Sequence, residues 1–142
     1  MSGFREPEKY IAKVTDWASS CVNIVALALV GSYARNQSRP DSDIDFVLIC
    51  DDPLHLLNNL SWIEQFGKVT TYKLEDWGTI TTVRVVYADG QEVEFGIAPG
   101  SWADVPVDGG TYQVVTDGML ILADKRDVLE KLENAVMKGK AG

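Results

Sequence analysis

Apolar residues recur near the start of the chain at the three- and four-residue spacing of an amphipathic helix. They are Tyr10, Ile11, Val14, Trp17, Ala18 and Cys21. This spacing places them on one helical face, and Pro7 suits a first turn, so we predict a helix that packs on a sheet. The next apolar run, residues 22–30, is short and rich in β-branched residues. It favours a buried strand.

A polar stretch separates this strand from a second apolar run. We expect residues 32–36 to form one or two helical turns and residues 37–42 to form a loop. Residues 43–50 then form the second strand. A further helix should begin with Pro53, which is tolerated in a first turn, and end near Gly67. Its predicted apolar face consists of Leu56, Leu57, Leu60 and Ile63.

Strand patterns dominate the second half of the chain. Alternating or apolar runs predict strands over 69–74, 79–87, 92–97, 112–115 and 119–122. The Asp-Gly pairs at 89–90 and 117–118 favour hairpin turns between neighbouring strands. A closing helix is expected over 126–137, where Asp127 and Glu130 resemble a capping box. The order of elements predicts an α+β fold, with one mixed sheet flanked by helices and a C-terminal half rich in β-hairpins.

Length and charge narrow the functional classes. A chain of 142 residues predicts a single domain over 1–142. Its net charge of −8 argues against nucleic acid as the main partner, because phosphate backbones are bound through clustered Lys and Arg. No apolar run approaches the roughly 20 residues of a membrane span, and the N-terminus lacks a signal-peptide core. Cys21 and Cys50 lie in apolar stretches, which favours reduced core thiols in a cytoplasmic protein.

The strongest chemical signal is a pair of aspartates that opens the second strand. Asp43 and Asp45 are two residues apart, so in an extended strand they point to one face while Ile44 and Phe46 point to the core. Two carboxylates about 4 Å apart repel by roughly 4 kcal/mol at an effective dielectric near 20. Such a pair is typical of a site that holds a cation. Magnesium, which takes oxygen ligands together with substrate phosphates, is the expected ion.

The residues before this pair carry a resemblance to a known family. Residues 31–45 read GSYARNQSRPDSDID, with an apolar strand on either side. This order of features resembles the signature of nucleotidyltransferases related to DNA polymerase β, in particular the small bacterial kind. The resemblance implies the nucleotidyltransferase fold and two Mg²⁺ ions bound with a nucleoside triphosphate. It also implies that Gly31 and Ser32 hold the distal phosphates, while Arg35 either contacts phosphate or braces the loop through an ion pair.

A pair of metal ions needs a third carboxylate from a neighbouring strand. Glu92 and Glu94 share the outer face of the strand over 92–97. Glu94 matches the family's mid-strand position better, and Glu92 lies nearer the turn; a purely solvated role for both is the alternative. Two departures bear on catalytic competence. The family's third acid is more often Asp, and Asn36 stands where the family usually has Gly, although Asn tolerates left-handed geometry.

The predicted function is magnesium-dependent transfer of a nucleoside monophosphate from a nucleoside triphosphate, with ATP preferred, to a hydroxyl of a small-molecule acceptor, releasing pyrophosphate. Asp43, Asp45 and Glu94 would be the catalytic and metal-binding residues, and Gly31, Ser32 and Arg35 the nucleotide-binding residues. A homodimer or a protein partner is compatible with this prediction. Two alternatives remain: an antitoxin-like enzyme that modifies a protein partner, and a nucleotide-binding module without turnover.

Other polar and aromatic residues give weaker signals. His55, the only histidine, lies in the first turn of a predicted helix, where a solvated position is favoured over a catalytic one. Lys73 and Arg84 lie on strands near the expected site, and either could balance phosphate charge. Trp77 and Trp102 border loops, where packing is favoured over stacking on a base or an acceptor ring.

Overall fold

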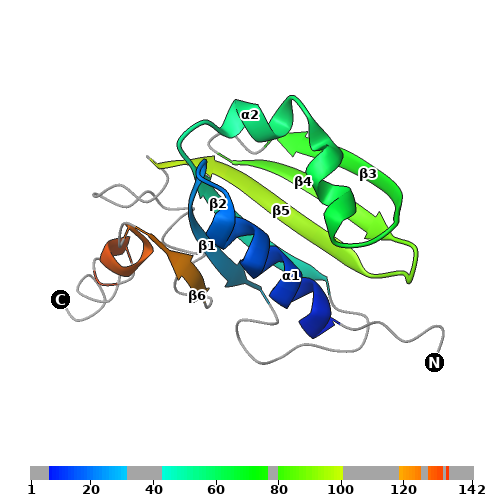
Figure 1. The fold of residues 1–142 in the computed structure, drawn as a ribbon, viewed down its shortest axis with the longest axis horizontal. Helices are drawn as coiled ribbons and strands as arrows, with labels where there is room; N and C mark the ends of the chain where they lie inside the picture. The colour runs from blue at the N-terminus through cyan, green and yellow to red at the C-terminus, as the bar shows by residue number, and fades with distance from the viewer. Residues whose placement is uncertain are drawn as a thin grey trace.

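The computed structural model describes residues 7–31, 43–76, 80–100, 119–125, 128–132 and 134. Its elements are α1 (Pro7–Ser20), β1 (Ile24–Val30), β2 (Ile44–Cys50), α2 (Pro53–Leu57), the 3₁₀ helix η1 (Leu60–Gln65), β3 (Val69–Asp76), β4 (Thr81–Tyr87), β5 (Glu92–Pro99) and β6 (Met119–Asp124). Figure 1 labels all of them except η1. Residues 128–132 and 134 are helical and form the described part of the expected closing helix. The helical turns expected over 32–36, the loop over 37–42 and the strand over 112–115 lie outside the described residues.

All six of these strands belong to one sheet, in the order β3-β4-β5-β2-β1-β6. The pair β2–β5 is parallel, and the other neighbouring pairs are antiparallel. The predicted mixed sheet with helices is therefore confirmed. Because β2 lies between β1 and β5, residues that are far apart in the sequence meet on either side of the aspartate-bearing strand.

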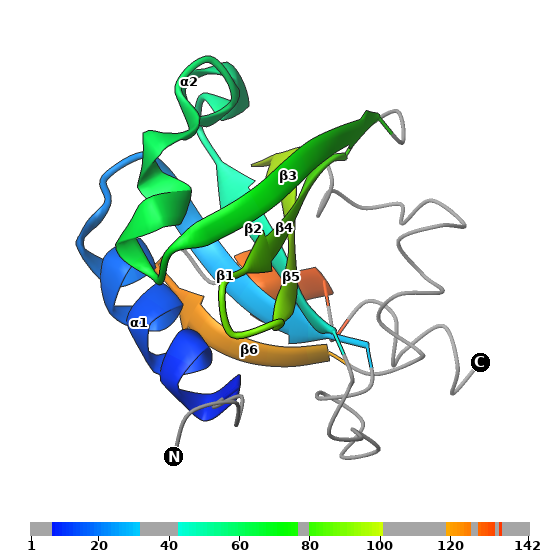
Figure 2. The same cartoon turned by 90° about the vertical axis from the view of Figure 1, so that its right-hand side faces the viewer.

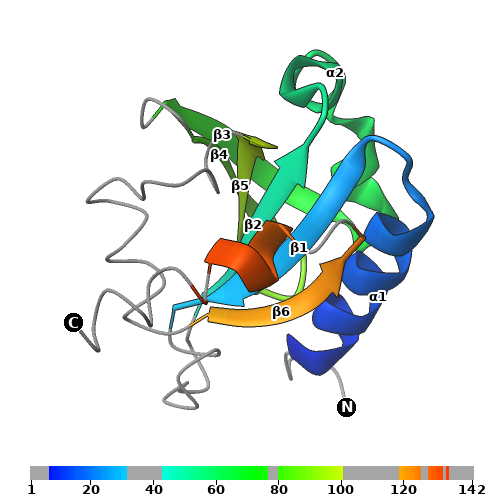
Figure 3. The same cartoon turned by 90° about the vertical axis from the view of Figure 1, so that its left-hand side faces the viewer.

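The two faces of the sheet are covered by different helices. On one face α1, α2 and η1 pack on the sheet, and their apolar residues join the inward side chains of β1, β2, β4 and β5 in one core. On the other face Leu129 and Leu132 of the C-terminal helix pack against a second, smaller cluster of side chains from β1, β2 and β5. Figures 2 and 3 show α1 and this orange-red helix on opposite sides of the sheet. Among the described residues, the smaller cluster includes none from β3 or β4.

An aromatic cluster fixes the helical layer to the sheet. Trp17 of α1 stacks on Trp62 of η1 with ring centroids 4.9 Å apart, and Trp62 meets Phe95 of β5 edge-on at 5.0 Å. The indole N–H of Trp62 donates a hydrogen bond of 3.0 Å to the backbone oxygen of Leu56. The buried indole therefore has a polar partner. Trp17 takes the packing role that its helical spacing predicts.

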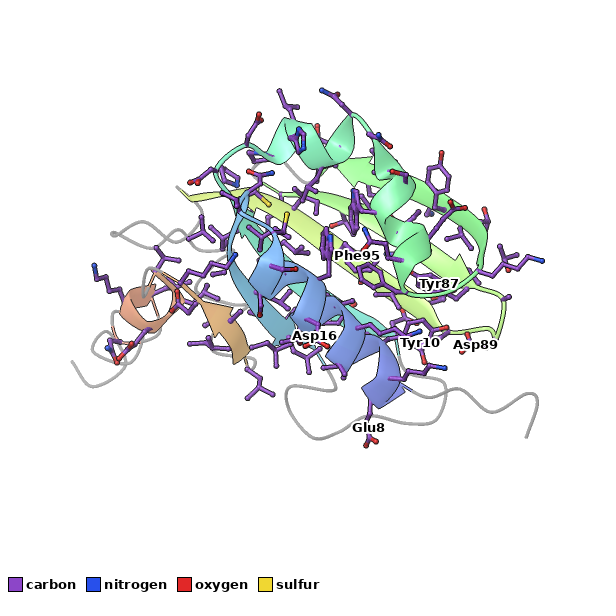
Figure 4. All side chains as sticks on the ribbon, in the orientation of Figure 1. Glu8, Tyr10, Asp16, Tyr87, Asp89 and Phe95 are labelled. Carbon is purple, nitrogen blue, oxygen red and sulfur yellow. The ribbon has the colours of Figure 1, made fainter. Side chains whose placement is uncertain are left out.

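The hairpin expected at Asp89–Gly90 is present and is tied to α1. The backbone N–H of Tyr87 donates to the oxygen of Gln91 at 2.9 Å, so three residues form the loop. Gly90 has φ +90°, the left-handed geometry that a three-residue hairpin requires at its last position. The hydroxyl of Tyr10 donates to Asp89 Oδ2 at 2.8 Å, and Figure 4 shows these side chains together at the hairpin end.

Several predicted strands differ from the structure by one or two residues at an end, and two differences in boundary have a visible local cause. The single helix expected over 53–67 is divided into α2 and η1. The side chain of Asn59 accepts a hydrogen bond from the backbone N–H of Ser61 at 3.1 Å, and this cap starts the new helix. The strand expected from residue 22 begins at Ile24, because Val22 lies in a turn and is 90% exposed.

Several further expectations concern single residues. Cys21 and Cys50 are free thiols, and Cys50 is buried, as their apolar surroundings predict. His55 is exposed, in agreement with a surface role. At the C-terminal helix, Asp124 Oδ2 accepts hydrogen bonds from two backbone N–H groups, those of Leu129 and Glu130; the capping role predicted for Asp127 lies outside the described residues. None of the helices within the described ranges has the length and apolar character of a membrane span.

Candidate active site

The order of the strands brings three parts of the chain together at one end of the neighbouring strands β1, β2 and β5. The end of β1 pairs with the start of β2, with Val30 opposite Asp45. The start of the parallel strand β5 lies on the other side of β2, with Glu94 opposite Asp45. Side chains at paired positions point to the same face of a sheet. Asp45 and Glu94 therefore project side by side, next to the bend that follows β1.

Asp45 lies in an environment that opposes its ionisation. Burial, a hydrogen bond with the Glu94 side chain and the negative charges of Glu94 and Asp43 together raise the pKa of Asp45 to about 8, while the positive charge of Arg84 acts in the opposite direction. Asp45 Oδ1 is buried and has no hydrogen-bond partner among the described residues. An orphaned carboxylate oxygen in such a setting has free capacity to coordinate a cation.

Gly31 brings the backbone directly against Asp45. Its φ is +75°, a conformation that residues with a Cβ rarely adopt. A Cβ built at this position would overlap Asp45 Oδ2 and lie 3.3 Å from Asp45 Cγ. Glycine is therefore required here twice, by its backbone conformation and by the space that the carboxylate occupies. Glycine also contributes no side chain of its own between the end of β1 and the acidic pair.

Charged residues continue from Glu94 across the neighbouring strands. Arg84 of β4 pairs in register with Glu94, and its Nη2 forms an ion pair with Glu94 Oε1. Arg84 Nε lies 3.1 Å from Glu75 Oε1 on β3, and Lys73 Nζ lies 3.7 Å from the same oxygen. One face of β2, β5, β4 and β3 thus carries alternating acidic and basic side chains beyond Asp45.

The structure places most of the predicted acidic residues together. Asp43 immediately precedes β2, and its charge acts on Asp45. Glu94 contacts Asp45, whereas Glu92 lies two residues nearer the hairpin and pairs with Val86. Glu94 is therefore the glutamate of this strand that adjoins Asp45. The predicted phosphate ligands Ser32 and Arg35, together with Asn36, Trp77 and Trp102, lie outside the described residues.

Comparison with known proteins gives the family. Residues 4–139 match the family model described as streptomycin adenylyltransferase. The chain belongs to this family. The expected relationship to nucleotidyltransferases is thereby confirmed at the level of family. The matched residues include all of the strands that carry the candidate site.

A solved structure supports the nucleotidyltransferase fold for this member of the streptomycin adenylyltransferase family. An aminoglycoside 6-adenyltransferase from Bacillus subtilis superposes with a TM-score of 0.57 at 19% identity, over 70% of this chain and 37% of that chain. A CCA-adding enzyme in an apo form superposes with a TM-score of 0.43 at 18% identity, over 89% of this chain and 33% of that chain. The chain thus spans about a third of the length of either protein. No curated protein sequence matches significantly.

The chemistry of the acidic residues in this family member fits a divalent cation. Asp43, Asp45 and Glu94 offer hard oxygen ligands, and the orphaned Asp45 Oδ1 is an observation independent of the family. Within the ranges that the structure describes, no three acidic, His or Cys side chains converge into a complete cation cluster. Glu94 is instead engaged by Arg84.

The contacts that Arg84 makes with Glu94 and Glu75 are a feature of the candidate site that the sequence did not predict. The pattern of the strands placed both Lys73 and Arg84 near the site and did not separate them. The structure does: Arg84 contacts Glu94, whereas Lys73 is 66% exposed and its ion pair is with Glu75. The contact between Arg84 and Glu94 could have been predicted from the register of the β4–β5 hairpin, which places the two residues opposite each other.

Proposed function

We propose that the chain is a nucleotidyltransferase domain that transfers the nucleoside monophosphate of ATP to a hydroxyl of a small-molecule acceptor and releases pyrophosphate. The observation that carries this proposal is the pairing of Asp45 with Glu94 on the neighbouring strands β2 and β5, with the Gly31 backbone against Asp45. Membership of an adenylyltransferase family supports adenylyl transfer as the reaction.

The proposed cofactor is Mg²⁺, as two ions with the bound nucleotide. Asp43 and Asp45 would hold both ions, and Glu94 would hold the ion nearer the acceptor. When bound, Mg²⁺ neutralises phosphate charge and polarises the phosphoryl group. The raised pKa of Asp45 fits this assignment, because a cation supplies the positive charge that the crowded carboxylates lack.

The chain's own residues would bind and orient the reactants. The bend at Gly31, which has no side chain, lets the triphosphate approach the backbone, and Ser32 and Arg35 are proposed as further phosphate ligands. Glu94 would accept the proton of the acceptor hydroxyl. The acceptor oxygen then forms a bond to the α-phosphorus, the bond from the α-phosphorus to the bridging oxygen of the β-phosphate breaks, and pyrophosphate leaves with the electron pair. Most of the rate enhancement would come from positioning and charge balance.

The test is transfer of label from α-labelled nucleoside triphosphates in the presence of Mg²⁺, with pyrophosphate measured in parallel. ATP is compared with the other triphosphates, and streptomycin and other hydroxyl compounds are offered as acceptors. We expect Asp45→Asn and Glu94→Gln to lower the rate by roughly a hundredfold. Glu92→Gln is the matched control, since it removes the same charge from the same strand without touching Asp45, and it should keep the wild-type rate.

Other outcomes would contradict the proposal. Label on a co-purified protein, with none on small molecules, would favour an enzyme that modifies a protein partner. Nucleotide binding without pyrophosphate release, with every acceptor and partner tried, would favour a nucleotide-binding module. Equal activity of Asp45→Asn and the wild type would refute the site itself. A homodimer remains a prediction, which sedimentation of the active protein would test.

A further inference from the structure

Arg84 is held between two carboxylates on neighbouring strands. Its Nη2 contacts Glu94 Oε1 on β5, and its Nε lies 3.1 Å from Glu75 Oε1 on β3. The Arg84 side chain is 35% exposed, and those of Glu94 and Glu75 are 22% and 24% exposed. The guanidinium is permanently charged, and its two ion pairs place it against Glu94. A fixed positive charge therefore lies at the carboxylate proposed to bind a divalent cation.

We propose that Arg84 competes with the divalent cation for Glu94: it holds this carboxylate beside Asp45 when the cation is absent and weakens the binding of the cation. The inference rests on the proposed function, because that function places a cation at Glu94. Arg84 is a positioning residue in this scheme, since it acts through Glu94 and contacts neither substrate nor cofactor.

The competition follows from shared atoms and from charge. Glu94 Oε1, which Arg84 contacts, is one of two oxygens through which Glu94 could coordinate a cation. A guanidinium also repels a doubly charged ion nearby, and in a partly buried site this repulsion is screened less than at an open surface. Removal of Arg84 frees the oxygen and removes the repulsion. It also frees the Glu94 rotamer, and the entropy that this side chain loses when a cation orders it again offsets part of the gain.

Arg84 should have the opposite effect on the cation-free protein. Glu94 and Asp45 are adjacent acidic side chains, and Asp45 also interacts with Asp43. Without Arg84, no positive side chain on β4 offsets the negative charge of Glu94 at the paired position. A variant that lacks the guanidinium should therefore be less stable in chelator. It should regain more stability than the wild type when a divalent cation is added, because a ligand that binds the folded state stabilises it according to its affinity.

The experiment measures binding of Mn²⁺ alone, by electron paramagnetic resonance and calorimetry, without nucleotide or acceptor. We expect Arg84→Gln to bind Mn²⁺ roughly tenfold more tightly than the wild type. Arg84→Met, which keeps the aliphatic stem, is measured in parallel in case the first variant folds poorly, and it should show the same tightening. Arg84→Lys, which keeps the charge, should stay close to the wild type.

Lys73→Gln is the matched control. Lys73 pairs in register with Arg84 on the adjacent strand, and its loss changes the net charge by the same amount. Among the described residues, however, its ion pair is with Glu75 and not with Glu94. Its Mn²⁺ affinity should equal that of the wild type. Thermal melts of every variant in chelator and in Mn²⁺ provide the second readout.

The outcomes separate this inference from the proposed function. In one outcome, the wild type binds Mn²⁺, Asp45→Asn abolishes this binding, and Arg84→Gln and Arg84→Met leave it unchanged or weaken it. This result would overturn the competition and leave the proposed site intact. Tightening by Lys73→Gln as large as that by Arg84→Gln would show a general charge effect and also overturn it. If the wild-type protein binds no Mn²⁺, with or without nucleotide, both the competition and the proposed cation site are refuted.

Discussion

The contact between Gly31 and Asp45 gives the sharpest test of the site. Gly31→Ala adds one Cβ at a position with φ +75°, where it would overlap Asp45 Oδ2. Two costs arise. The first is the left-handed backbone, which is about 1–2 kcal/mol for a residue with a Cβ. The second is relief of the overlap, and it is the second cost that bears on function.

The magnitude of each cost follows from what the new methyl group meets. Its nearest neighbour is the far end of the Asp45 side chain, which can rotate, rather than rigid backbone. We expect the overlap to add only about 1 kcal/mol, at the low end of overpacking. The carboxylate must nevertheless leave its position beside Glu94. The rate of nucleotidyl transfer should therefore fall by more than roughly tenfold, since displacement of a reacting group by about 1 Å is costly.

Gly90→Ala is the matched control. Gly90 has φ +90°, and a Cβ added there would meet no atom of the described residues within 4 Å, so the substitution carries the backbone cost without the overlap. Denaturant unfolding and the transfer assay are run on both variants. Gly90→Ala should lose about 1–2 kcal/mol of stability and keep its activity. Equal activity of the two variants would refute the reasoning, because the Gly31–Asp45 contact would then have no functional consequence.

Three further predictions concern single groups. In chelator, the free energy of unfolding should fall as the pH rises from about 4 to about 8, and Asp45→Asn should remove this dependence. The reason is that the pKa of Asp45 is raised from 3.8 to about 8 in the folded state. The stability that protonation provides is therefore complete below the lower value and is lost as the pH rises through the higher one. Tyr87→Phe removes a buried 2.8 Å hydrogen bond to the backbone oxygen of Ile63 and should cost about 1–2 kcal/mol in denaturant unfolding without changing transfer activity. Burial raises the pKa of the Cys50 thiol to about 12, so mass spectrometry of the native protein after brief alkylation should find label on Cys21 and none on Cys50.

The boundaries of elements show where local pattern was insufficient. The apolar spacing over 53–67 fits one helix, yet Asn59 caps a second one, because a side chain that bonds to its neighbouring backbone competes with helix continuation. Val22 matches a strand by composition, but the strand begins at Ile24. In both places a local hydrogen bond or turn, which hydrophobic periodicity does not encode, set the end of the element.

The sequence by itself determined the strands that carry the acidic residues and the faces to which they point. Asp45 points away from the buried Ile44 and Phe46 because side chains alternate along a strand. In the same way, Glu94 points away from its buried neighbours Val93, Phe95 and Ile97. The motif from Gly31 to Asp45 was sufficient to indicate the family. None of this required knowledge of which strands are neighbours.

Only the tertiary structure decided which residues meet. The parallel pairing of β2 with β5 places Glu94, rather than Glu92, at Asp45, and local pattern contains no information on that pairing. The three-residue loop of the β4–β5 hairpin sets Arg84 opposite Glu94; a two-residue turn at Asp89–Gly90 would shift the register by one and send Arg84 to the other face. Side-chain direction reverses with each residue of slip, so a site built across strands depends on register. The hairpin loop fixes this register for β4 and β5, and long-range pairing fixes it for β2 and β5.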